Sequence, residues 1–579
     1  MMLQPCHIQV ILPLRLGWEP FYIAGPDAYP GQRVRVNFSG KNYIGVVHRT
    51  GVVPDLEENR IKRILGPAEG YDDISPRELE LWEFTAEYYL CTIGEVYKTA
   101  YPIQKLEAEG AGAREIQRLR TRLEKVDSEL ERRSMSKRAS SEVTDRLAAE
   151  RDRLLVQLAC LKEEAKEGAR TASPEKAKGP GRKPVLLVSE DRTGKYMAEI
   201  RKTLAEGRSV LVLAPDIIFC EKLEDRIAPV FPQLLTYNSK KTKTAQKRVV
   251  EAVRNNCSLV LGTRSAIFLP FNDLGLIIVD NEQDSSFKQE EPAPRYNGRD
   301  LAIILARIHG AGIILGTSTP SLESIINCRS GKFILEKENA SECKRTIQVI
   351  DIPEEKRKNG MVGLFSRKLI DEINSTEGKV ALIRSWEKPE EVKELTDALF
   401  PSRAISIMTM AEARRGTLKD FALTAVLQAD AFMSKDEFRS DERMLHTLKS
   451  LSELCGGQLF IQSANGGHRV YQAAVANSVE FTESILKERK DFDLPPFTRL
   501  VDVVFTDDNG ARLAKLSSEM MRQLRKDFRI SGMMDGRMRI SFSRDAGLSE
   551  KKTALMRAVD EFIEKRNYGQ HVHLDADPN

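Results

Sequence analysis

The sequence has little of what marks secreted, membrane-spanning or zinc-binding proteins. Its 579 residues contain no run of about 18 apolar residues, the length that a membrane-spanning helix needs. The opening residues form neither a basic leader nor a small-residue cleavage site, so we expect a cytoplasmic protein without a membrane span. The eight cysteines include no C-x-x-C pair, which argues against both a zinc ribbon and a disulfide framework.

Excess charge of one sign is also scarce, since the net charge is only +4. Such a weakly basic chain can contact nucleic acid through local patches, but its overall charge does not require it. The length and a hydrophobic content of 41% predict about four domains with cores of their own.

The N-terminal third differs in composition from the rest. Residues 1–104 contain short strands followed by a helical stretch, which predicts a small β-rich domain. In residues 105–167, apolar residues recur at intervals of three and four among Glu, Arg and Lys, the pattern of a heptad seam. We expect two antiparallel helices joined near residues 133–141, with an intermolecular coiled coil as the alternative. Residues 168–183 are rich in Gly, Pro, Ala and Lys and predict a linker.

The rest of the chain alternates between strands and helices. Over residues 184–355, apolar strands such as VLVLAP and LGLIIVD alternate with helical segments, which predicts a parallel sheet with helices on both faces. Residues 356–475 repeat this rhythm with shorter strands and predict a second α/β lobe. Residues 476–579 mix strands with two amphipathic helices and predict an α+β domain. The expected fold class is therefore multidomain α/β.

The segment LLVSEDRTGKYMAEI has the strand–turn–helix order of a phosphate loop and keeps two of its residues, Gly194 and Lys195. A working loop has the pattern G-x-x-x-x-G-K-[ST], in which backbone N–H groups surround the phosphates and the hydroxyl binds magnesium. Here Ser189 takes the first glycine position, and Tyr196 takes the hydroxyl position. The two acidic residues after Ser189 would also repel phosphates.

A second acidic position belongs to the same chemistry. Asp280 ends the apolar strand LGLIIVD, where an acid can orient magnesium at the carboxyl edge of a parallel sheet. An active motor would follow it with a glutamate that polarises the attacking water, whereas this chain has Asn281. An ordinary strand that ends in an acidic turn is the alternative.

The stretches around these positions resemble the PriA replication-restart helicase family, a group of superfamily-two motors. Family members have D-E-E-H, D-S-S-Y-K-Q, P-R-Y-x-x-R-D and G-S-A-T-P-S-L-E-S, and this chain has DNEQ, DSSFKQ, PRYNGRD and GTSTPSLES in the same order. GQRVRVNFSGKNYIGVV is similar to the family's DNA 3′-end-binding domain, and DLPPFTRL and HVHLDADPN are similar to its C-terminal domain. The resemblance implies two RecA-like helicase lobes over residues 184–355 and 356–475.

The departures from the family pattern concern ATP chemistry. Besides the substitutions at Ser189, Tyr196 and Asn281, Gln283 replaces the family's histidine. LKSLSELCGG replaces Q-V-A-G-R-A-G-R, whose arginines contact the γ-phosphate. Losing several groups that stabilise transition-state charge argues against ATP-driven unwinding. No catalytic set is expected to be intact, and these residues are expected to be remnants of the catalytic and nucleotide-binding site: Gly194, Lys195, Tyr196, Asp280 and Glu282.

The second lobe keeps one family element and lacks another. VLQADAFMSKDEFRSDER resembles the D-F-R-A-x-E-R element through Phe438, Arg439 and Glu442. The family's cysteine-rich zinc insertion is missing, because GKVALIRSWEKPEEVKELTDALFP contains no cysteine. We therefore expect no zinc or other metal and predict no cofactor, with ATP and magnesium as the alternative.

The resemblance also indicates candidates for DNA contact. Arginine and lysine neutralise phosphates, and an aromatic ring can stack an unpaired base for about 1–3 kcal/mol. In the 3′-end pocket, Phe21 and Ser39 stand where we expect a small polar or acidic residue and a glycine, so fork binding is better supported than end recognition. The candidates in the N-terminal domain and the first lobe are Tyr22, Arg33, Arg35, Lys41, Lys62, Arg264, Lys288, Arg295 and Arg299.

The sequence therefore predicts a degenerate relative of replication-restart helicases. We expect it to bind branched or single-stranded DNA at replication forks, in the nucleoid, and to promote replicative helicase loading together with primosome proteins. We expect it to lack ATP-driven unwinding. Two alternatives stay open. One is a weak but active ATP-dependent 3′–5′ helicase that uses Lys195 and Asp280, and the other is an interaction scaffold in which the charged helical hairpin binds a partner.

Overall fold

The structure is a computed structural model of the whole chain. It describes residues 6–102, 122–123, 125–130, 146–157, 182–255, 257–338, 346–416, 418–433, 437–476, 479–534, 536–545, 547–566 and 568–578. Most of the predicted hairpin over residues 105–167 and nearly all of the predicted linker over residues 168–183 lie outside the described residues.

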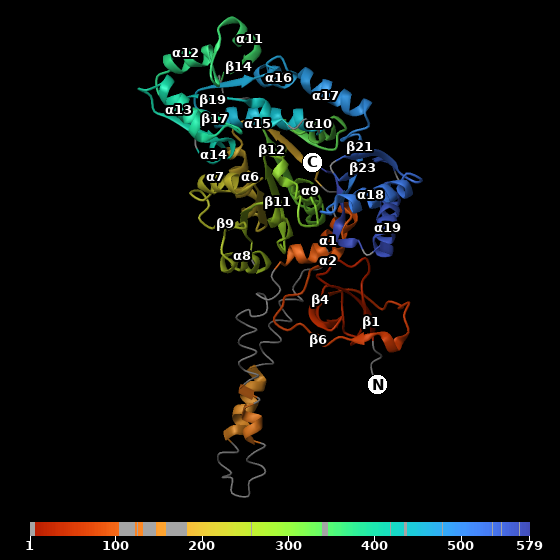
Figure 1. The fold of residues 1–579 in the computed structure, drawn as a ribbon. Helices are drawn as coiled ribbons and strands as arrows, with labels where there is room; N and C mark the ends of the chain where they lie inside the picture. Colours follow the sequence, from red (N-terminus) through yellow and green to blue (C-terminus); the bar gives the residue numbers. More distant parts are fainter. Residues whose placement is uncertain are drawn as a thin grey trace.

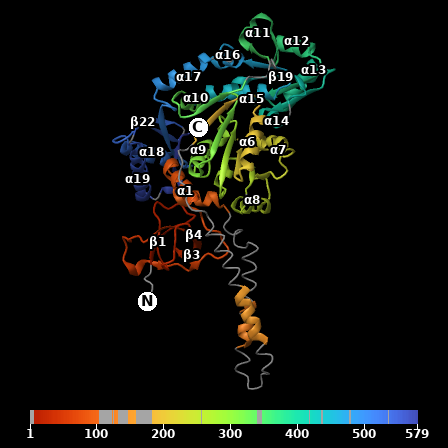
Figure 2. The ribbon, with the colours of Figure 1, turned by 180° about the vertical axis from the view of Figure 1, so that it is seen from behind.

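Two described pieces of the predicted hairpin lie side by side. Residues 125–130 and 146–157 are helical, and both ribbon views place them next to each other and away from the two sheets of the lobes (Figures 1 and 2). That the two helices form a complete hairpin within one chain, rather than a coiled coil between two chains, stays a prediction. Two ion pairs connect the described pieces, Arg122–Glu150 at 2.5 Å and Asp127–Arg151 at 2.9 Å.

The N-terminal domain is a β-sheet followed by two helices. Alternating apolar residues direct Ile8, Val10, Val34 and Val36 into its core. Ser75 and Thr92 each begin a helix with a capping box. The sheet has the order β5-β2-β1-β4-β3-β6. Its elements are β1 (Cys6–Ile11), β2 (Phe21–Ala24), β3 (Arg33–Phe38), β4 (Lys41–Thr50), β5 (Lys62–Arg63) and β6 (Gly66–Pro67), followed by α1 (Pro76–Tyr89) and α2 (Ile93–Ala100).

The first lobe is a parallel seven-stranded sheet with helices on both faces (Figure 1). Its central strands are apolar on both sides because helices cover both faces. The strand order is β13-β7-β12-β11-β8-β10-β9. The strands are β7 (Val185–Val188), β8 (Ser209–Leu213), β9 (Leu235–Tyr237), β10 (Leu259–Gly262), β11 (Leu274–Asp280), β12 (Gly312–Thr317) and β13 (Ile334–Lys337). The helices are α6 (Thr193–Ala205), α7 (Ile217–Ile227), α8 (Lys243–Asn255), α9 (Gly298–His309) and α10 (Leu322–Arg329).

The second lobe is a parallel five-stranded sheet with the order β14-β20-β19-β17-β18. Its strands are β14 (Ile347–Asp351), β17 (Lys379–Arg384), β18 (Ile405–Thr409), β19 (Phe421–Val426) and β20 (Gln458–Ser463), and β15 (Met361–Val362) pairs separately with β16 (Phe365–Ser366). The helices are α11 (Ile352–Lys358), α12 (Arg367–Ser375), α13 (Pro389–Leu399), α14 (Met410–Arg415), α15 (Ser440–Leu454), α16 (Arg469–Ala476) and α17 (Val479–Asp491).

Both ends of the second lobe differ from the predicted bounds of residues 356–475. Strand β14 precedes the predicted start, yet it pairs in parallel with β20. Helix α17 follows the predicted end, yet Phe481 and Ile485 pack in the core of this lobe. Periodicity finds each element in the sequence, but it carries no information on which distant strand or core the element joins.

The C-terminal domain is an antiparallel four-stranded sheet with two helices, as the predicted α+β class requires. Its order is β22-β23-β21-β24. One apolar core continues from α1 and α2 through the first lobe into this domain, and both ribbon views show the three parts in contact (Figures 1 and 2). The elements are β21 (Thr498–Phe505), α18 (Gly510–Leu524), β22 (Arg529–Met534), β23 (Arg537–Ser543), α19 (Leu548–Arg566) and β24 (Val572–Ala576).

Candidate nucleotide cleft and nucleic-acid interface

The phosphate-loop position lies between β7 and α6 of the first lobe. A helix N-terminus attracts anions because its first N–H groups have no partner within the helix. Here the Asp191 carboxylate accepts the N–H of Thr193 at 3.2 Å, so an acidic side chain of the loop itself contacts the start of α6. Ser189 Oγ donates to the backbone oxygen of Asp191 at 2.9 Å and holds the turn.

Behind this turn, the Arg192 side chain points inward onto the end of β11. Its Nε donates to Asp280 Oδ1 at 2.9 Å, its Nη2 to Asn281 Oδ1 at 3.1 Å and its Nη1 to the Ser189 carbonyl at 2.6 Å. The Tyr196 hydroxyl donates to the same Asp280 Oδ1 at 2.8 Å. We call these five residues the phosphate-loop cluster.

The phosphate-loop cluster is buried, which makes its internal charge pairing strong. The side chains of Arg192 and Asp280 are only 8% and 7% exposed. Burial by itself would lower the pKa of Arg192, but the neighbouring Asp280 carboxylate raises it above its ordinary value. Burial raises the pKa of Tyr196 well above its ordinary value, so its hydroxyl stays a neutral hydrogen-bond donor.

Magnesium and nucleotide phosphates do not fit these residues. Asp280, which would orient the metal, already accepts two hydrogen bonds on Oδ1, and Arg192 neutralises its charge. Asn281 donates its amide N–H to Asp280 Oδ2 at 3.2 Å. A methyl group on Gly316 of β12 would collide with the Tyr196 hydroxyl, so the glycine provides the space in which the phenol lies.

Lys195, the remaining phosphate-loop lysine, points to the edge strand β13, which lies next to β7. Its Nζ lies 3.2 Å from Glu336 Oε2 on the edge strand β13, and both side chains are partly exposed. Hydrogen bonding to Glu336 raises the pKa of Lys195. The lysine is therefore charged but directed away from Asp280.

Helix α15 of the second lobe carries an acid, Glu453, that faces the first lobe. Glu453 hydrogen-bonds with Ser318 of the first lobe, and burial raises the pKa of its carboxyl group. Arg192 and Asp280 both lie within electrostatic reach of it. The neighbouring Lys449 has a pKa lowered by burial and faces Glu190 of the phosphate loop. The two lobes thus meet through their own opposite charges at the position where a nucleotide would bind.

A second contact between the lobes involves the C-terminal end of α14. Arg414 Nη2 lies 2.9 Å from Asp284 Oδ2 and 3.5 Å from Asp216 Oδ2, and its guanidinium lies over the Phe219 ring at 5.3 Å. Lys222 of α7 donates to the Arg414 carbonyl at 2.7 Å. Four residues of the first lobe therefore hold one arginine of the second.

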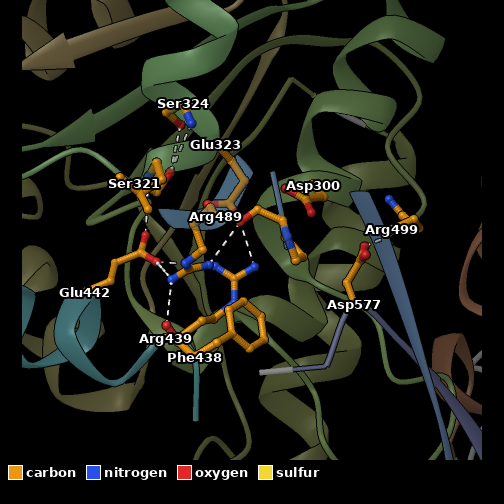
Figure 3. Close-up of polar contacts among 12 residues, drawn as sticks. Asp300, Ser321, Glu323, Ser324, Phe438, Arg439, Glu442, Arg489, Arg499 and Asp577 are labelled. Carbon is orange, nitrogen blue, oxygen red and sulfur yellow. Dashed lines mark hydrogen bonds and ion pairs between the residues drawn. The ribbon is translucent and has the colours of Figure 1, made fainter. Parts of the chain in front are cut away.

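A third contact is a chain of charges that runs from α10 through α15 to α17 (Figure 3). Arg439 lies 2.8 Å from Glu323 and 3.5 Å from Glu442, and Arg489 lies 3.2 Å from the same Glu442 oxygen. The Phe438 ring lies beneath both guanidinium groups, at 5.1 and 4.5 Å. Although burial opposes ionisation, Arg439 holds the pKa of Glu323 well below its usual range.

The predicted DNA-contacting residues of the first lobe lie mostly inside the protein. Lys288 is 4% exposed, and its Nζ donates to Asp575 Oδ1 at 2.7 Å and to the Arg295 carbonyl at 2.6 Å. The guanidinium of Arg299 pairs with Glu282 at 3.0 Å.

These contacts correct the expectation that Lys288, Arg295 and Arg299 form a DNA surface. The Arg295 side chain is only 9% exposed, and Arg264 donates to the Ser286 carbonyl at 2.8 Å. The sequence could not indicate these roles because the partner strand β24 lies almost three hundred residues away. Glu282, expected to be a catalytic remnant, is buried and accepts the backbone N–H of Ser321 at 2.8 Å.

The N-terminal candidates divide into buried and exposed residues. Arg33 is 2% exposed and lies over the Tyr101 ring at 4.2 Å, so it belongs to the core rather than to a DNA surface. Tyr22 is also 2% exposed, and its hydroxyl donates to the Asn37 carbonyl at 3.1 Å. Burial raises the pKa of Tyr22 to about 12. Three candidates lie on the surface: Arg35, Lys41 and Lys62.

Two of these surface residues, Lys41 and Lys62, each contact a residue near the tip of the β3–β4 hairpin. Lys62 Nζ donates to Asn37 Oδ1 at 3.2 Å, and Phe38 pairs across the hairpin with Lys41. The Trp18 ring lies 6.1 Å from the Phe38 ring. We call Trp18, Asn37, Phe38, Lys41 and Lys62 the hairpin-tip cluster. Ser39 in the turn has a φ of +47°, a conformation that glycine adopts most easily.

Sequence reasoning missed Trp18 and Phe38, although both were visible as aromatic residues near basic ones. Trp18 lies in the β1–β2 loop and Phe38 in β3, so only the folded sheet brings the two rings together. Within the described ranges, no helix is both long and apolar enough to span a bilayer.

Two parallel sheets, with an acid at the end of β11 and a turn at the phosphate-loop position after β7, form a two-lobe α/β fold like that of RecA-like helicase lobes. Residues 9–102 match the family model described as "3'DNA-binding domain (3'BD)" of PriA. The replication restart protein PriA of Haemophilus influenzae is 23% identical over 703 residues, which cover 95% of this chain and 96% of the relative. PriA of Helicobacter pylori is 40% identical over 144 residues, which cover 24% of this chain and 23% of the relative. The chain is thus a relative of the replication restart protein PriA.

Solved structures give a weaker likeness. RecG bound to a three-way DNA junction has a TM-score of 0.36 and 13% identity, over 82% of this chain and 68% of that chain. The DExH-box NTPase HrpB of E. coli has a TM-score of 0.34 and 10% identity, over 51% of this chain and 41% of that chain. Neither value supports a statement on function.

Proposed function

We propose that this chain is a DNA-binding replication-restart protein that recognises branched DNA and promotes replicative helicase loading without ATP-driven unwinding. One observation carries the absence of ATP-driven unwinding: Arg192 and Tyr196 both donate to Asp280, the carboxylate that would orient a metal. A phosphoryl-transfer site works by placing a metal ion and positive charge on the phosphates. Here the Asp280 carboxylate instead forms an ion pair with Arg192 inside the protein.

The contacts between the lobes support the same conclusion. A helicase needs lobes that close on nucleotide and open after hydrolysis. In this chain Arg414 and Arg439 already join the lobes through carboxylates of the first lobe, at 2.9 and 2.8 Å. The two lobes then serve as a fixed frame that positions the N-terminal and C-terminal domains on DNA.

The DNA contacts are assigned to the N-terminal domain. Arg35, Lys41 and Lys62 project from its exposed surface, where lysine and arginine can neutralise phosphates. The family model that matches this domain is named for binding 3′ DNA, and the relatives are named for replication restart. The place of action is accordingly the replication fork, in the nucleoid.

Binding of fluorescent forked DNA by the full chain tests this function. We expect forks to be bound at physiological salt, with the same affinity in the presence and absence of ATP and magnesium, and we expect no strand separation. Replacing Arg35 and Lys62 together with alanine should weaken fork binding by at least about tenfold, because each removes a phosphate contact. Failure of the unaltered chain to bind forks, or ATP-dependent strand separation, would contradict the proposal.

A further inference from the structure

Trp18 is a large aromatic side chain that the fold leaves on the surface of the N-terminal domain. The chain has three tryptophans. Trp82 is 1% exposed in the core, whereas Trp18 is 55% exposed and Trp386 of the second lobe is 70% exposed. An exposed indole contributes little to stability, so its position near the surface lysines Lys41 and Lys62 is suited to a ligand that has both an aromatic face and negative charge.

The loop that carries Trp18 is held firmly in place. The neighbouring Glu19 Oε2 lies 2.7 Å from His48 Nδ1, and His48 Nε2 lies 2.8 Å from Glu83 on α1. On the same side, the Val10 N–H donates to the Pro20 carbonyl at 3.1 Å. The indole therefore projects from an anchored backbone, and little conformational entropy is lost when a ligand stacks on it.

The surroundings of Trp18 fit a nucleic-acid strand. The centroid of the Phe38 ring lies 6.1 Å from that of the indole at an interplanar angle of 57°, so the hairpin holds a second aromatic ring beside Trp18 in a tilted arrangement. Lys41 pairs with Phe38 across the same hairpin, and Lys62 contacts the adjacent Asn37. Aromatic rings beside lysines are the arrangement with which proteins bind single strands: the ring stacks a base, and the lysines contact the flanking phosphates.

We propose that Trp18 is the stacking platform for an unpaired base of the DNA strand, with Lys41 and Lys62 contacting the phosphates on either side. This inference rests on the proposed function, because it assigns the base-contacting residue of the same DNA-binding domain. The nearby Glu19 does not oppose it, since the imidazole of His48 lies against that carboxylate. Stacking needs no base edge, so the site accepts any base.

The test compares single-stranded and duplex DNA. Trp18→Ala should weaken binding of a single strand of about 12 nucleotides by about tenfold, whereas binding of a blunt duplex, which offers no unpaired base, should change less than about twofold. Trp18→Phe should keep most of the affinity because it keeps an aromatic face. Trp386→Ala, which removes the other exposed indole, is the matched control and should change neither affinity.

Tryptophan fluorescence separates this inference from the proposed function. In the Trp386→Phe chain, Trp18 is the one exposed tryptophan, because Trp82 is buried. The emission of Trp18 should therefore be quenched as the single strand binds. Unchanged emission, or an unchanged single-strand affinity of Trp18→Ala in a chain that still binds forks, overturns the role of Trp18 and leaves the proposed function standing. If the unaltered chain binds neither forks nor single strands, both fail. An equal loss on duplex and single strand indicates a merely structural role and also overturns it.

Discussion

The phosphate-loop cluster and the hairpin-tip cluster stand in opposite relations to solvent. In the first, Arg192, Tyr196 and Asp280 turn toward one another and are buried. In the second, Lys41 and Lys62 lie on the surface beside an exposed indole. Polar groups that pair with one another inside the protein stabilise the fold, whereas polar groups that face solvent can bind a ligand. The difference favours a structural role for the phosphate-loop cluster and a ligand-binding role for the hairpin-tip cluster, as the proposed function requires.

The substitutions in the phosphate-loop cluster depend on one another physically. Arg192 could not be buried without the Asp280 carboxylate, because an unpaired buried charge is costly. Its Nη2 also needs an acceptor, which the Asn281 side-chain oxygen provides at 3.1 Å. The Tyr196 ring needs the empty space above Gly316. Arg192, Tyr196 and Asn281 thus form one packed arrangement around Asp280, in which each substitution depends on the others.

The largest expected effect is on stability, from removing Asp280. Asp280→Ala should lower the free energy of unfolding by about 3–5 kcal/mol, because it leaves the buried Arg192 charge without a partner. Urea denaturation measures this. Lys195→Ala is the matched control, because that lysine pairs with Glu336 at a partly exposed position. It should lower the free energy of unfolding by less than about 1 kcal/mol. Equal small effects at the two positions would remove the contrast between a structural Asp280 and a displaced Lys195.

The next effect concerns the charged contact between the lobes (Figure 3). Arg439→Ala should lower the free energy of unfolding by about 2–3 kcal/mol, because Glu323 and Glu442 lose their common partner. It should also increase the distance between labels placed on the two lobes. Fluorescence energy transfer with and without ATP measures the distance, and ATP should not restore it. The exposed pair of Arg329 and Glu483 provides the control, since Arg329→Ala should leave both quantities nearly unchanged. A lobe separation that ATP reverses would be evidence for a working motor cycle.

A smaller effect is expected on DNA affinity from the hairpin-tip cluster. Lys62→Ala should weaken binding of all DNA forms severalfold and reduce the slope of log affinity against log salt by about 1, because one phosphate contact is lost. Anisotropy titrations over a series of salt concentrations measure the slope. Lys388→Ala on the second lobe, also an exposed lysine, should leave it unchanged. A slope that responds to Lys388 but not to Lys62 would move the DNA contact away from the N-terminal domain.

The smallest effect is a pH dependence that arises from His48. Burial lowers the pKa of His48, but Glu19 and Glu83 together raise it above its ordinary value. Because the folded-state pKa is raised, the stabilisation is fully present below the unfolded pKa of about 6.5 and is lost as pH rises through the folded pKa.

Thermal unfolding of the unaltered chain and of His48→Gln, compared across this pH range, tests the sign. The destabilisation caused by His48→Gln should be larger at acidic than at alkaline pH. The reverse order would show that His48 is buried in its neutral form, and the anchoring of the Trp18 loop would then need another cause.

Much of the fold follows from local sequence patterns, and much of the site does not. The alternation of apolar strands and helices predicts both parallel sheets, and the residues at Ser189, Tyr196 and Asn281 predict a damaged nucleotide site. The partner of Arg192 could not be predicted, because Asp280 is 88 residues away and the arginine lies at an unconstrained loop position. Burial of Lys288 depends on a strand at the far end of the chain, which periodicity cannot place.

Steady-state ATP hydrolysis by the full chain, with and without forked DNA, is the most direct measurement of the central claim. Because Arg192 and Tyr196 occupy Asp280, we expect no turnover above background in either condition, and no change on Lys195→Ala. DNA-stimulated turnover above about one per second, within the range of ordinary enzymes, that disappears on Lys195→Ala would show that Lys195 still serves a nucleotide. That result would contradict the account.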